Sequence, residues 1–186
     1  MRLLSSVIRS FAAAAILLPS ASLLAQGAPP PAGRVAVLDV ALYNAGANLQ
    51  EATDTAMAAL STQVLRGKLA ELLGDALIDS AAVRQVALSD SAMSITGNKP
   101  CNVIVACARH AGSKLGADHS VMAKLSKTSN LIWLFTGQLI NVRTGEILMD
   151  DSIELKGDVE PMVRAGTRNF AERLARTVKQ QAVSGR

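Results

Sequence analysis

The sequence predicts an α/β (α+β) fold in which helices pack on a single mixed sheet. The main observation is the stretch 117–156, which reads as three consecutive antiparallel strands joined by short polar turns. A second is the apolar segment Arg34–Val40, which predicts one buried strand ahead of the first long helix. A third is the set of flanking segments whose apolar residues recur at helical spacing. We therefore expect one domain over residues 34–183.

The middle strand of the three, Leu131–Val142, carries a dense apolar run. Because successive side chains point to opposite faces, this run predicts a central strand that is wetted on neither face. Its neighbours alternate between apolar and polar residues. In the third strand, Ile147–Leu155, Asp151 interrupts the apolar face, which indicates a bulge or an exposed strand end. Gly145 suits the positive φ of a short hairpin loop.

The helices follow from the spacing of apolar residues. Glu51–Gly74 and Glu160–Val183 are predicted as long amphipathic helices, and Ser80–Leu88 as a short one. Between Glu51–Gly74 and Ser80–Leu88, the residues Ala76–Asp79 are expected to form a short strand. Ser89–Pro100 is polar and rich in turn residues, so it reads as a connection.

Residues 1–25 have the pattern of a secretory signal peptide. Arg2 and Arg9 precede a short apolar run, and small residues lead to a cleavage position at Ala25, with Ala28 as the alternative. The apolar run is too short and too interrupted to serve as a membrane anchor. Residues 26–33 are rich in Gly, Pro and Ala and read as a flexible lead. The predicted location is the periplasm or the extracellular space, with no transmembrane span after cleavage.

Composition limits the classes of partner. Loss of Arg2 and Arg9 with the leader lowers the formal net charge from +4 to +2, so the high isoelectric point is weak evidence for an anionic partner. With 3 Phe, 1 Trp and 1 Tyr, the core must be mainly aliphatic. Scattered basic residues and few aromatic side chains also argue against nucleic-acid binding.

Two cysteines, Cys101 and Cys107, lie close together in a chain predicted to be secreted. Inside one continuous helix they would be about 9 Å apart along the axis, too far for a disulfide. A bridge therefore requires the helix that contains Cys107 to begin after Cys101, which agrees with Pro100 ahead of it and with Asn102 as a candidate N-cap. A structural disulfide is the preferred interpretation. A redox-active pair would more often have two intervening residues at a helix start.

No catalytic or metal-binding pattern frames the remaining polar residues. His110 and His119 are too few for a structural zinc site, and no nucleophile motif or phosphate-binding glycine loop is present. We expect no cofactor and no metal. The loop 41–50 follows the first strand, a common place for ligand contacts, so a ligand mouth could be formed by Asp39, Tyr43 and Asn44.

The last helix has a row of arginines outside its apolar face. Arg164, Arg168 and Arg176 could contact an acidic partner or anionic lipid. The alternative, which is more common, is an ordinary solvated face. The third strand of the sheet, Ile147–Leu155, is a further candidate, because an exposed edge strand can accept a strand from a partner.

Several segments together resemble a known family. They are RVAVLDV at 34–40, KLGADHSVMAKLSKTSN at 114–130, LIWLFTGQLINVRTGEIL at 131–148 and DSIELKGD at 151–158. This combination resembles an uncharacterised family of small secreted bacterial proteins, a domain of unknown function, and more widely the TolB amino-terminal and CsgG-like periplasmic domains. The resemblance covers roughly residues 34–180. The chain departs from the pattern at Asn141, where an Asp is expected, and in its wider cysteine spacing.

The resemblance implies a TolB amino-terminal-like α/β domain in the periplasm that works through binding or assembly, and it implies no reaction. The leading hypothesis is a non-enzymatic accessory protein that docks to an unidentified envelope protein or complex. The alternatives are a periplasmic carrier or sensor of a small ligand and, less favoured, a thiol oxidoreductase that uses Cys101 and Cys107. The sequence leaves the oligomeric state open.

Overall fold

The computed structural model describes residues 33–43, 52–97, 99, 101–129 and 131–184. Its strands form one five-stranded sheet in which β2 also pairs with β3 and the main order is β1-β3-β4-β5. The strands are β1 (Val35–Val37), β2 (Ala41–Leu42), β3 (His119–Lys127), β4 (Ile132–Asn141) and β5 (Ile147–Lys156). β1 and β2 run parallel to β3, whereas β3, β4 and β5 are antiparallel. The predicted mixed sheet with an antiparallel meander is confirmed.

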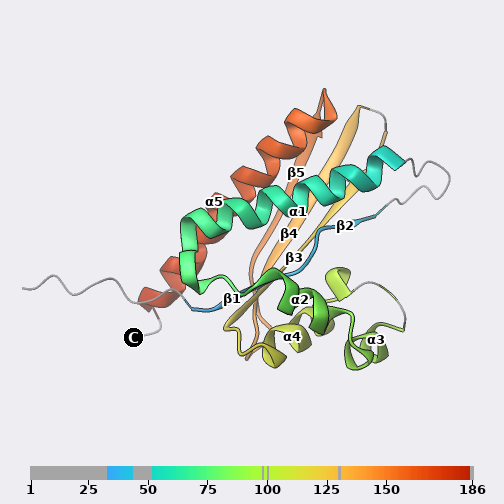
Figure 1. The fold of residues 1–186 in the computed structure, drawn as a ribbon. Helices are drawn as coiled ribbons and strands as arrows, with labels where there is room; N and C mark the ends of the chain where they lie inside the picture. The colour runs from blue at the N-terminus through green and yellow to red at the C-terminus, as the bar shows by residue number, and fades with distance from the viewer. Residues whose placement is uncertain (1–32, 44–51, 98, 100, 130, 185–186) are drawn as a thin grey trace, which may run out of the picture.

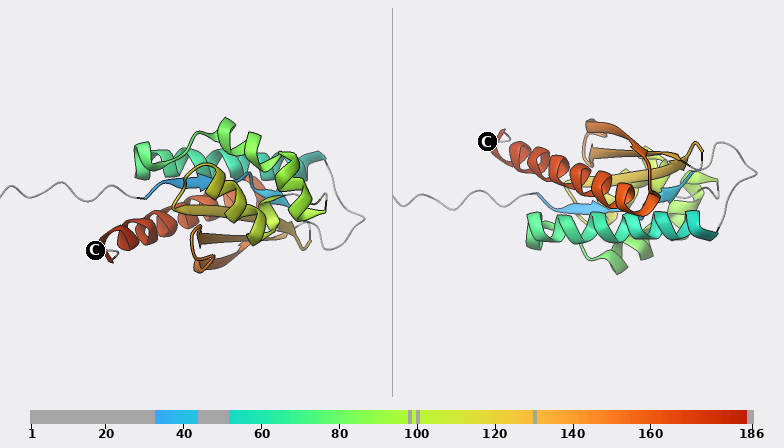
Figure 2. Two further views of the ribbon diagram at one scale, coloured as in Figure 1. Left: turned by 90° about the horizontal axis from the view of Figure 1, so that it is seen from below. Right: turned by 90° about the horizontal axis from the view of Figure 1, so that it is seen from above.

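The helices lie on both faces of this sheet. They are α1 (Ala52–Leu73), α2 (Ser80–Ala87), α3 (Asp90–Thr96), α4 (Val105–Lys114) and α5 (Val159–Ser184), with 3₁₀ turns at Gly74–Ala76 and Cys101–Val103. The long helices α1 and α5 pack against each other and cover one face. The short helices α2, α3 and α4 gather at one end of the strands, on the other face (Figures 1 and 2).

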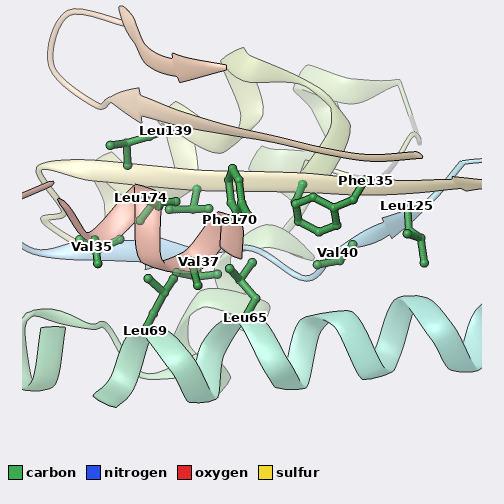
Figure 3. Close-up of a cluster of buried hydrophobic side chains, with 14 of the residues drawn as sticks. Val35, Val37, Val40, Leu65, Leu69, Leu125, Phe135, Leu139, Phe170 and Leu174 are labelled. Carbon is green, nitrogen blue, oxygen red and sulfur yellow. The ribbon is translucent and has the colours of Figure 1, made fainter. Parts of the chain in front are cut away.

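Large side chains fill the core under α1 and α5. Leu65 and Leu69 of α1 point toward the sheet, and Phe170 and Leu174 of α5 pack between them and β4 (Figure 3). The Phe135 and Phe170 rings lie 5.1 Å apart between centroids in a tilted arrangement. The Phe170 ring lies directly on Gly137 of β4, where any Cβ would collide with it. A glycine in the middle of this strand therefore serves the close approach of α5.

Small side chains fill the core on the other face. Cys107, Ala108 and Ala111 of α4 are fully buried against the sheet, together with Ile140 of β4. Close contact again depends on a glycine, because a Cβ on Gly112 would collide with side chains of β3 and the end of β4. This second core is confined to the end of the sheet where α2, α3 and α4 lie.

The buried stripe of α1 differs from the apolar pattern in two places. Besides Leu65 and Leu69, it buries Asp54 and Ser61. The Ser61 hydroxyl lies 2.9 Å from the hydroxyl of Thr167 on α5, which satisfies both groups inside the helix pair. Met57, Leu60 and Leu72, which helical spacing placed on the apolar face, are only partly buried.

Three segments differ from the prediction. Residues 41–50 were expected to be a loop, but Ala41–Leu42 forms β2, whose pairing with β3 is parallel. Ser89–Pro100 was expected to be a connection, but it contains α3, because the Ser89 hydroxyl accepts a hydrogen bond from the Ala92 amide and starts a helix. The short strand expected at Ala76–Asp79 is a single bridge between Leu77 and Val35.

Candidate docking surface and end groove

Half of one sheet face is left uncovered by the described helices. The odd-numbered residues of β4, such as Trp133 and Phe135, are buried toward α5, whereas Ile132, Leu134 and Thr136 point the other way and are only half-buried. The helices on that side cover Ile140 but leave this half of the strand open. The expectation that β4 is wetted on neither face is therefore wrong at this end.

We call this surface the bare face. Strand pairing places residues of β3 and β5 beside those of β4. The bare face consists of Tyr43, Lys124, Ser126, Ile132, Leu134, Thr136, Ser152, Glu154 and Lys156. Its centre is aliphatic and half-exposed, and its rim is polar, with an ion pair of 3.3 Å between Lys156 and Glu154. An apolar centre with a polar rim is typical of protein interfaces.

An aromatic side chain stands at one side of the bare face. Tyr43 is 51% exposed, and the Lys124 ammonium lies 5.3 Å from its ring centroid. Leu131, 70% exposed, lies in the β3–β4 connection just beyond Ile132. Tyrosine is enriched among the side chains that supply most of the binding energy in interfaces. The exposed leucine adds apolar area that a partner would bury.

The edge of the bare face is β5. Among the described residues this strand pairs with β4 alone, so its other edge offers unpaired backbone groups over Ile147–Lys156. Asp151 does not mark a strand end. Its carboxylate turns toward α5 and forms an ion pair with Arg173. The irregularity in pairing lies instead opposite Leu139 and Ile140. A ten-residue free edge is long enough for strand addition by a partner.

Asp39 and Tyr43, expected at one ligand mouth, contact different neighbours. The Asp39 carboxylate lies 2.8 Å from Arg66 Nη1 and 3.1 Å from Arg84 Nε. Its backbone carbonyl accepts a hydrogen bond of 2.7 Å from the Asn102 side chain. Tyr43 belongs to the bare face. Asn44 lies outside the described residues.

The pKa shifts of the two arginines agree with this arrangement. Burial lowers the pKa of Arg66, and the Asp39 carboxylate opposes that effect. The hydrogen bond to Asp39 raises the pKa of the exposed Arg84. Arg66 also donates to the Val37 carbonyl at 2.8 Å, which ties α1 to β1. Asp39 therefore holds α1 and α2 beside the first strand.

The arginine row of α5 lies on the surface. Arg164 forms a salt bridge of 2.8 Å with Glu160 one turn earlier on the helix. Arg168 and Arg176 are exposed. All three lie on the helix that covers the opposite side of the sheet from the bare face, so the two candidate docking surfaces are separate.

Cys101 and Cys107 are joined by a disulfide with their Cα atoms 5.1 Å apart. The chain forms a 3₁₀ turn at Cys101–Val103 before α4 begins at Val105, which provides the fold-back that a bridge needs. Both cysteines are buried in the small-residue core. Thiol exchange requires access to a sulfur atom, so this environment favours a structural role. Asn102 does not cap α4; it binds the Asp39 carbonyl.

A groove with a volume of about 1050 Å³ lies at the end of the sheet that is farther from the bare face. We call it the end groove. It is lined by one side of α4, by the ends of β3 and β4, and by α5 near its C-terminus. His110 and His119 both line it, and His110 Nε2 lies 3.0 Å from the Ser91 hydroxyl. Burial lowers the pKa of His119, while the Asp118 carboxylate opposes this shift.

A smaller cavity of about 320 Å³ lies between the first turns of α1 and α5. It is lined by a buried ion pair, in which Lys127 Nζ lies 3.1 Å from Asp54 Oδ1, and by Trp133. The Lys127 ammonium also lies 5.7 Å from the Trp133 ring centroid. In the described part of the chain, no group of His, Cys, Asp and Glu residues could hold a metal ion. Within the same residues, no helix is long and apolar enough to span a bilayer.

The fold and these surfaces define a small α+β domain with one mixed sheet. The chain belongs to the family described as "Protein of unknown function (DUF2380)", whose model matches residues 33–174. This confirms the resemblance to an uncharacterised family. The comparison with curated proteins finds no match.

Several solved structures are similar to the chain. The LpoB C-terminal domain from Salmonella enterica is 19% identical with a TM-score of 0.47, over 71% of this chain and 87% of that one. Lipoprotein GNA1162 from Neisseria meningitidis is 13% identical with a TM-score of 0.42, over 76% and 99%. TolB from Acinetobacter baumannii is 14% identical with a TM-score of 0.41, over 85% and 30%. At this level of similarity, none of them assigns a partner to this chain.

Sequence reasoning identified the edge strand β5 as a docking candidate, but it missed the bare face beside that strand and the end groove. Ile132 and Leu134 look like core residues in a run of apolar letters, and only the position of the short helices shows that they are half-exposed. Arg109 and Arg143, which line the end groove, are far apart in the sequence. One sequence signal could have pointed to Arg109. It is spaced three and four residues from Ala106 and Ser113, so these residues share the side of α4 opposite Cys107.

Proposed function

We propose that this protein is a non-enzymatic accessory protein of the bacterial cell envelope that binds a partner protein through the bare face. The observation that carries the proposal is the half-exposed aliphatic centre of Ile132 and Leu134 on an open sheet surface, next to exposed Tyr43. Apolar area on an open face is unfavourable in water and marks interaction surfaces when it is contiguous. A partner that covers it gains the burial that the short helices do not provide.

The free edge of β5 adds specificity to this docking mode. A partner strand laid along Ile147–Lys156 would pair its backbone with the edge and continue the sheet. Its side chains would then alternate between the bare face and the side of α5. Backbone pairing fixes the register, and contact with Leu134 and Tyr43 would supply apolar burial.

The proposed compartment is the periplasm. The disulfide between Cys101 and Cys107 is of a kind that persists in oxidising compartments. The leader 1–25 lies outside the described residues, so the signal peptide and its cleavage at Ala25 stay predictions. Both features support export of the domain 34–183.

The test is recovery of the tagged mature protein from crosslinked cell envelopes, with the bound proteins identified by mass. One variant changes the bare face, Tyr43→Ser with Leu134→Ser. The other changes the arginine row, Arg164→Gln with Arg168→Gln and Arg176→Gln. We expect one dominant envelope protein to be lost with the first variant and kept with the second, while both variants keep a cooperative melting transition.

Two outcomes would contradict the proposal. Loss of the partner with the arginine variant alone would move the docking surface to α5. Recovery of the wild-type protein as a clean monomer, with no dominant partner, would reject protein docking and favour a ligand-binding function.

A further inference from the structure

The end groove is built by one side of α4. Ala106, Arg109, His110 and Ser113 recur at three and four residues and line it, while Cys107, Ala108 and Ala111 on the other side of the helix are buried against the sheet. The lining also includes Ile95 of α3 and Gln181 and Ala182 of α5. The groove is therefore shared by three helices.

Two arginines give this groove its charge. Arg109 Nε donates to the Val142 carbonyl at 3.2 Å, and Arg109 Nη2 donates to the Arg143 carbonyl at 3.1 Å. These bonds hold the planar guanidinium against the β4–β5 turn, where Gly145 has a φ of 80° and leaves room for it. A guanidinium fixed in this way loses little side-chain entropy when it binds a further group. Arg143 lies next to it and is exposed.

The described lining residues include one carboxylate, Asp118, which balances the charge of only one of these two arginines. Asp118 Oδ2 accepts a hydrogen bond of 2.8 Å from the Arg34 amide. The side chains of Arg109 and Arg143 form no salt bridge with any described carboxylate within 4.0 Å. The described lining thus keeps an excess of positive charge, and guanidinium groups bind carboxylates with paired hydrogen bonds.

The size of the groove indicates what kind of carboxylate-bearing molecule it can bind. Its volume of about 1050 Å³ lies at the upper end of the ~300–1,000 Å³ range of pockets that enclose a drug-sized ligand. It is open to solvent, and its lining includes Ile95, an apolar side chain that is 41% exposed. A lone small anion would leave most of this volume empty. A chain of residues that carries both carboxylates and an apolar side chain would fill it.

We infer that the end groove binds an extended acidic peptide segment of a partner protein. Carboxylate side chains of the segment lie on Arg109 and Arg143, and an apolar side chain of the segment packs on Ile95. The inference is independent of the bare face, because the two surfaces share no residue and lie at different ends of the sheet.

The experiment measures fluorescence anisotropy of a labelled peptide, Gly-Leu-Glu-Glu-Leu-Gly, with the mature protein at 150 mM salt. The matched peptide has Gln in place of both Glu residues. We expect the acidic peptide to bind at least tenfold more tightly than the neutral one. Arg143→Gln should weaken binding of the acidic peptide about tenfold. Lys68→Gln, which removes the same charge from the surface of α1, should change it less than twofold.

Arg109→Gln removes two hydrogen bonds as well as a charge, so its melting temperature is measured alongside. If Lys68→Gln and Arg143→Gln weakened binding of the acidic peptide equally, the inference would be overturned, because the peptide would then be held by non-specific electrostatic attraction. Equal binding of the acidic and neutral peptides, or no binding of the acidic peptide at 1 mM protein, would overturn it as well. Displacement of the peptide by an equal concentration of free glutamate or phosphate would also overturn it in favour of a small-anion site.

Discussion

The two faces of the sheet are covered in different ways. On one face, α1 and α5 bury large side chains along the length of the strands, including Phe135, Phe170 and Leu174. On the other face, α2, α3 and α4 bury small side chains such as Cys107 and Ala111 at one end and leave the other end open. The first face holds most of the large-residue core, whereas the second carries the bare face; the end groove lies at the end of the sheet, between α4 and the C-terminal part of α5.

The contrast separates stability from binding. Burial of a large apolar side chain contributes about 1.5–3 kcal/mol, so the face under α1 and α5 dominates the free energy of folding. Residues of the bare face contribute less because Leu134 and Thr136 remain partly in water. Substitutions under α1 and α5 should therefore mainly lower the free energy of unfolding, whereas substitutions on the bare face should mainly weaken partner binding.

The largest effect is expected in the core under α5. Phe170→Ala removes the ring that packs on Phe135 and Gly137, and it should lower the free energy of unfolding by about 3–5 kcal/mol. Phe170→Leu keeps part of the volume and should cost less. Urea denaturation measures both. A loss below about 1 kcal/mol for Phe170→Ala would mean that α5 does not anchor the fold.

A similar loss is expected at the buried ion pair on the same face. The Asp54 and Lys127 side chains are 2% and 7% exposed, so Asp54→Asn leaves a poorly solvated ammonium and should cost about 3 kcal/mol. The exposed pair of Glu160 and Arg164 provides the matched control, and Glu160→Gln should cost less than about 0.5 kcal/mol. Equal losses in thermal or urea unfolding would contradict the difference in burial.

The disulfide should have an intermediate effect. It closes a short loop, with a sequence separation of 6, in the small-residue core. Loss of the loop constraint in the unfolded chain should lower stability by about 2 kcal/mol in Cys101→Ala with Cys107→Ala. Circular dichroism during urea unfolding measures this, with the reduced wild-type protein as control. A loss larger than that of Phe170→Ala would reverse the proposed ranking of the two cores.

The pH dependence of stability tests the burial of His119. Its pKa is lowered in the folded state, so between that value and the ordinary ~6.5 the unfolded chain binds more protons than the folded one. The contribution of His119 is therefore fully present above about pH 6.5 and is lost as the pH falls through the lowered pKa. His119→Gln should reduce the fall in melting temperature between pH 7.5 and pH 5. An unchanged fall would show that His119 does not contribute.

The smallest effect on stability is expected on the bare face. Leu134→Ser removes a half-buried side chain and should lower the free energy of unfolding by about 1 kcal/mol or less. The same change should abolish partner recovery if this face docks. Leu139→Ser, on the buried side of the same strand, is the matched control and should destabilise the protein severely. Equal destabilisation by the two changes would show that the face is covered.

The sequence predicted the sheet well because its signals are local. Alternation of apolar and polar residues placed Val121 and Leu125 on one face, and turn chemistry placed the hairpin at Gly145. The bounds of α1 and α5 follow from apolar spacing over more than five turns each. Short elements were harder, since α3 depends on the Ser89 cap and β2 on pairing with a distant strand.

The candidate surfaces could not be predicted in the same way. A half-exposed Ile132 and a buried Ile140 look alike in the sequence, and only the placement of α4 distinguishes them. The end groove depends on α4, β4 and α5 meeting at one end of the sheet. The disulfide between Cys101 and Cys107 was the exception, because the short spacing of the two cysteines and the predicted export of the chain together indicated a bridge.

The most direct test of the central claim is site-specific photocrosslinking in intact envelopes. A photoreactive side chain replaces Ser152 on the bare face or Arg168 on the exposed side of α5. If the bare face is the docking surface, the photoreactive side chain at position 152 should give one discrete crosslinked product, and Leu134→Ser should abolish it. The side chain at position 168 should give no product of the same mass. The same product from position 168 alone, or no product from position 152 while the partner is still recovered, would contradict the claim.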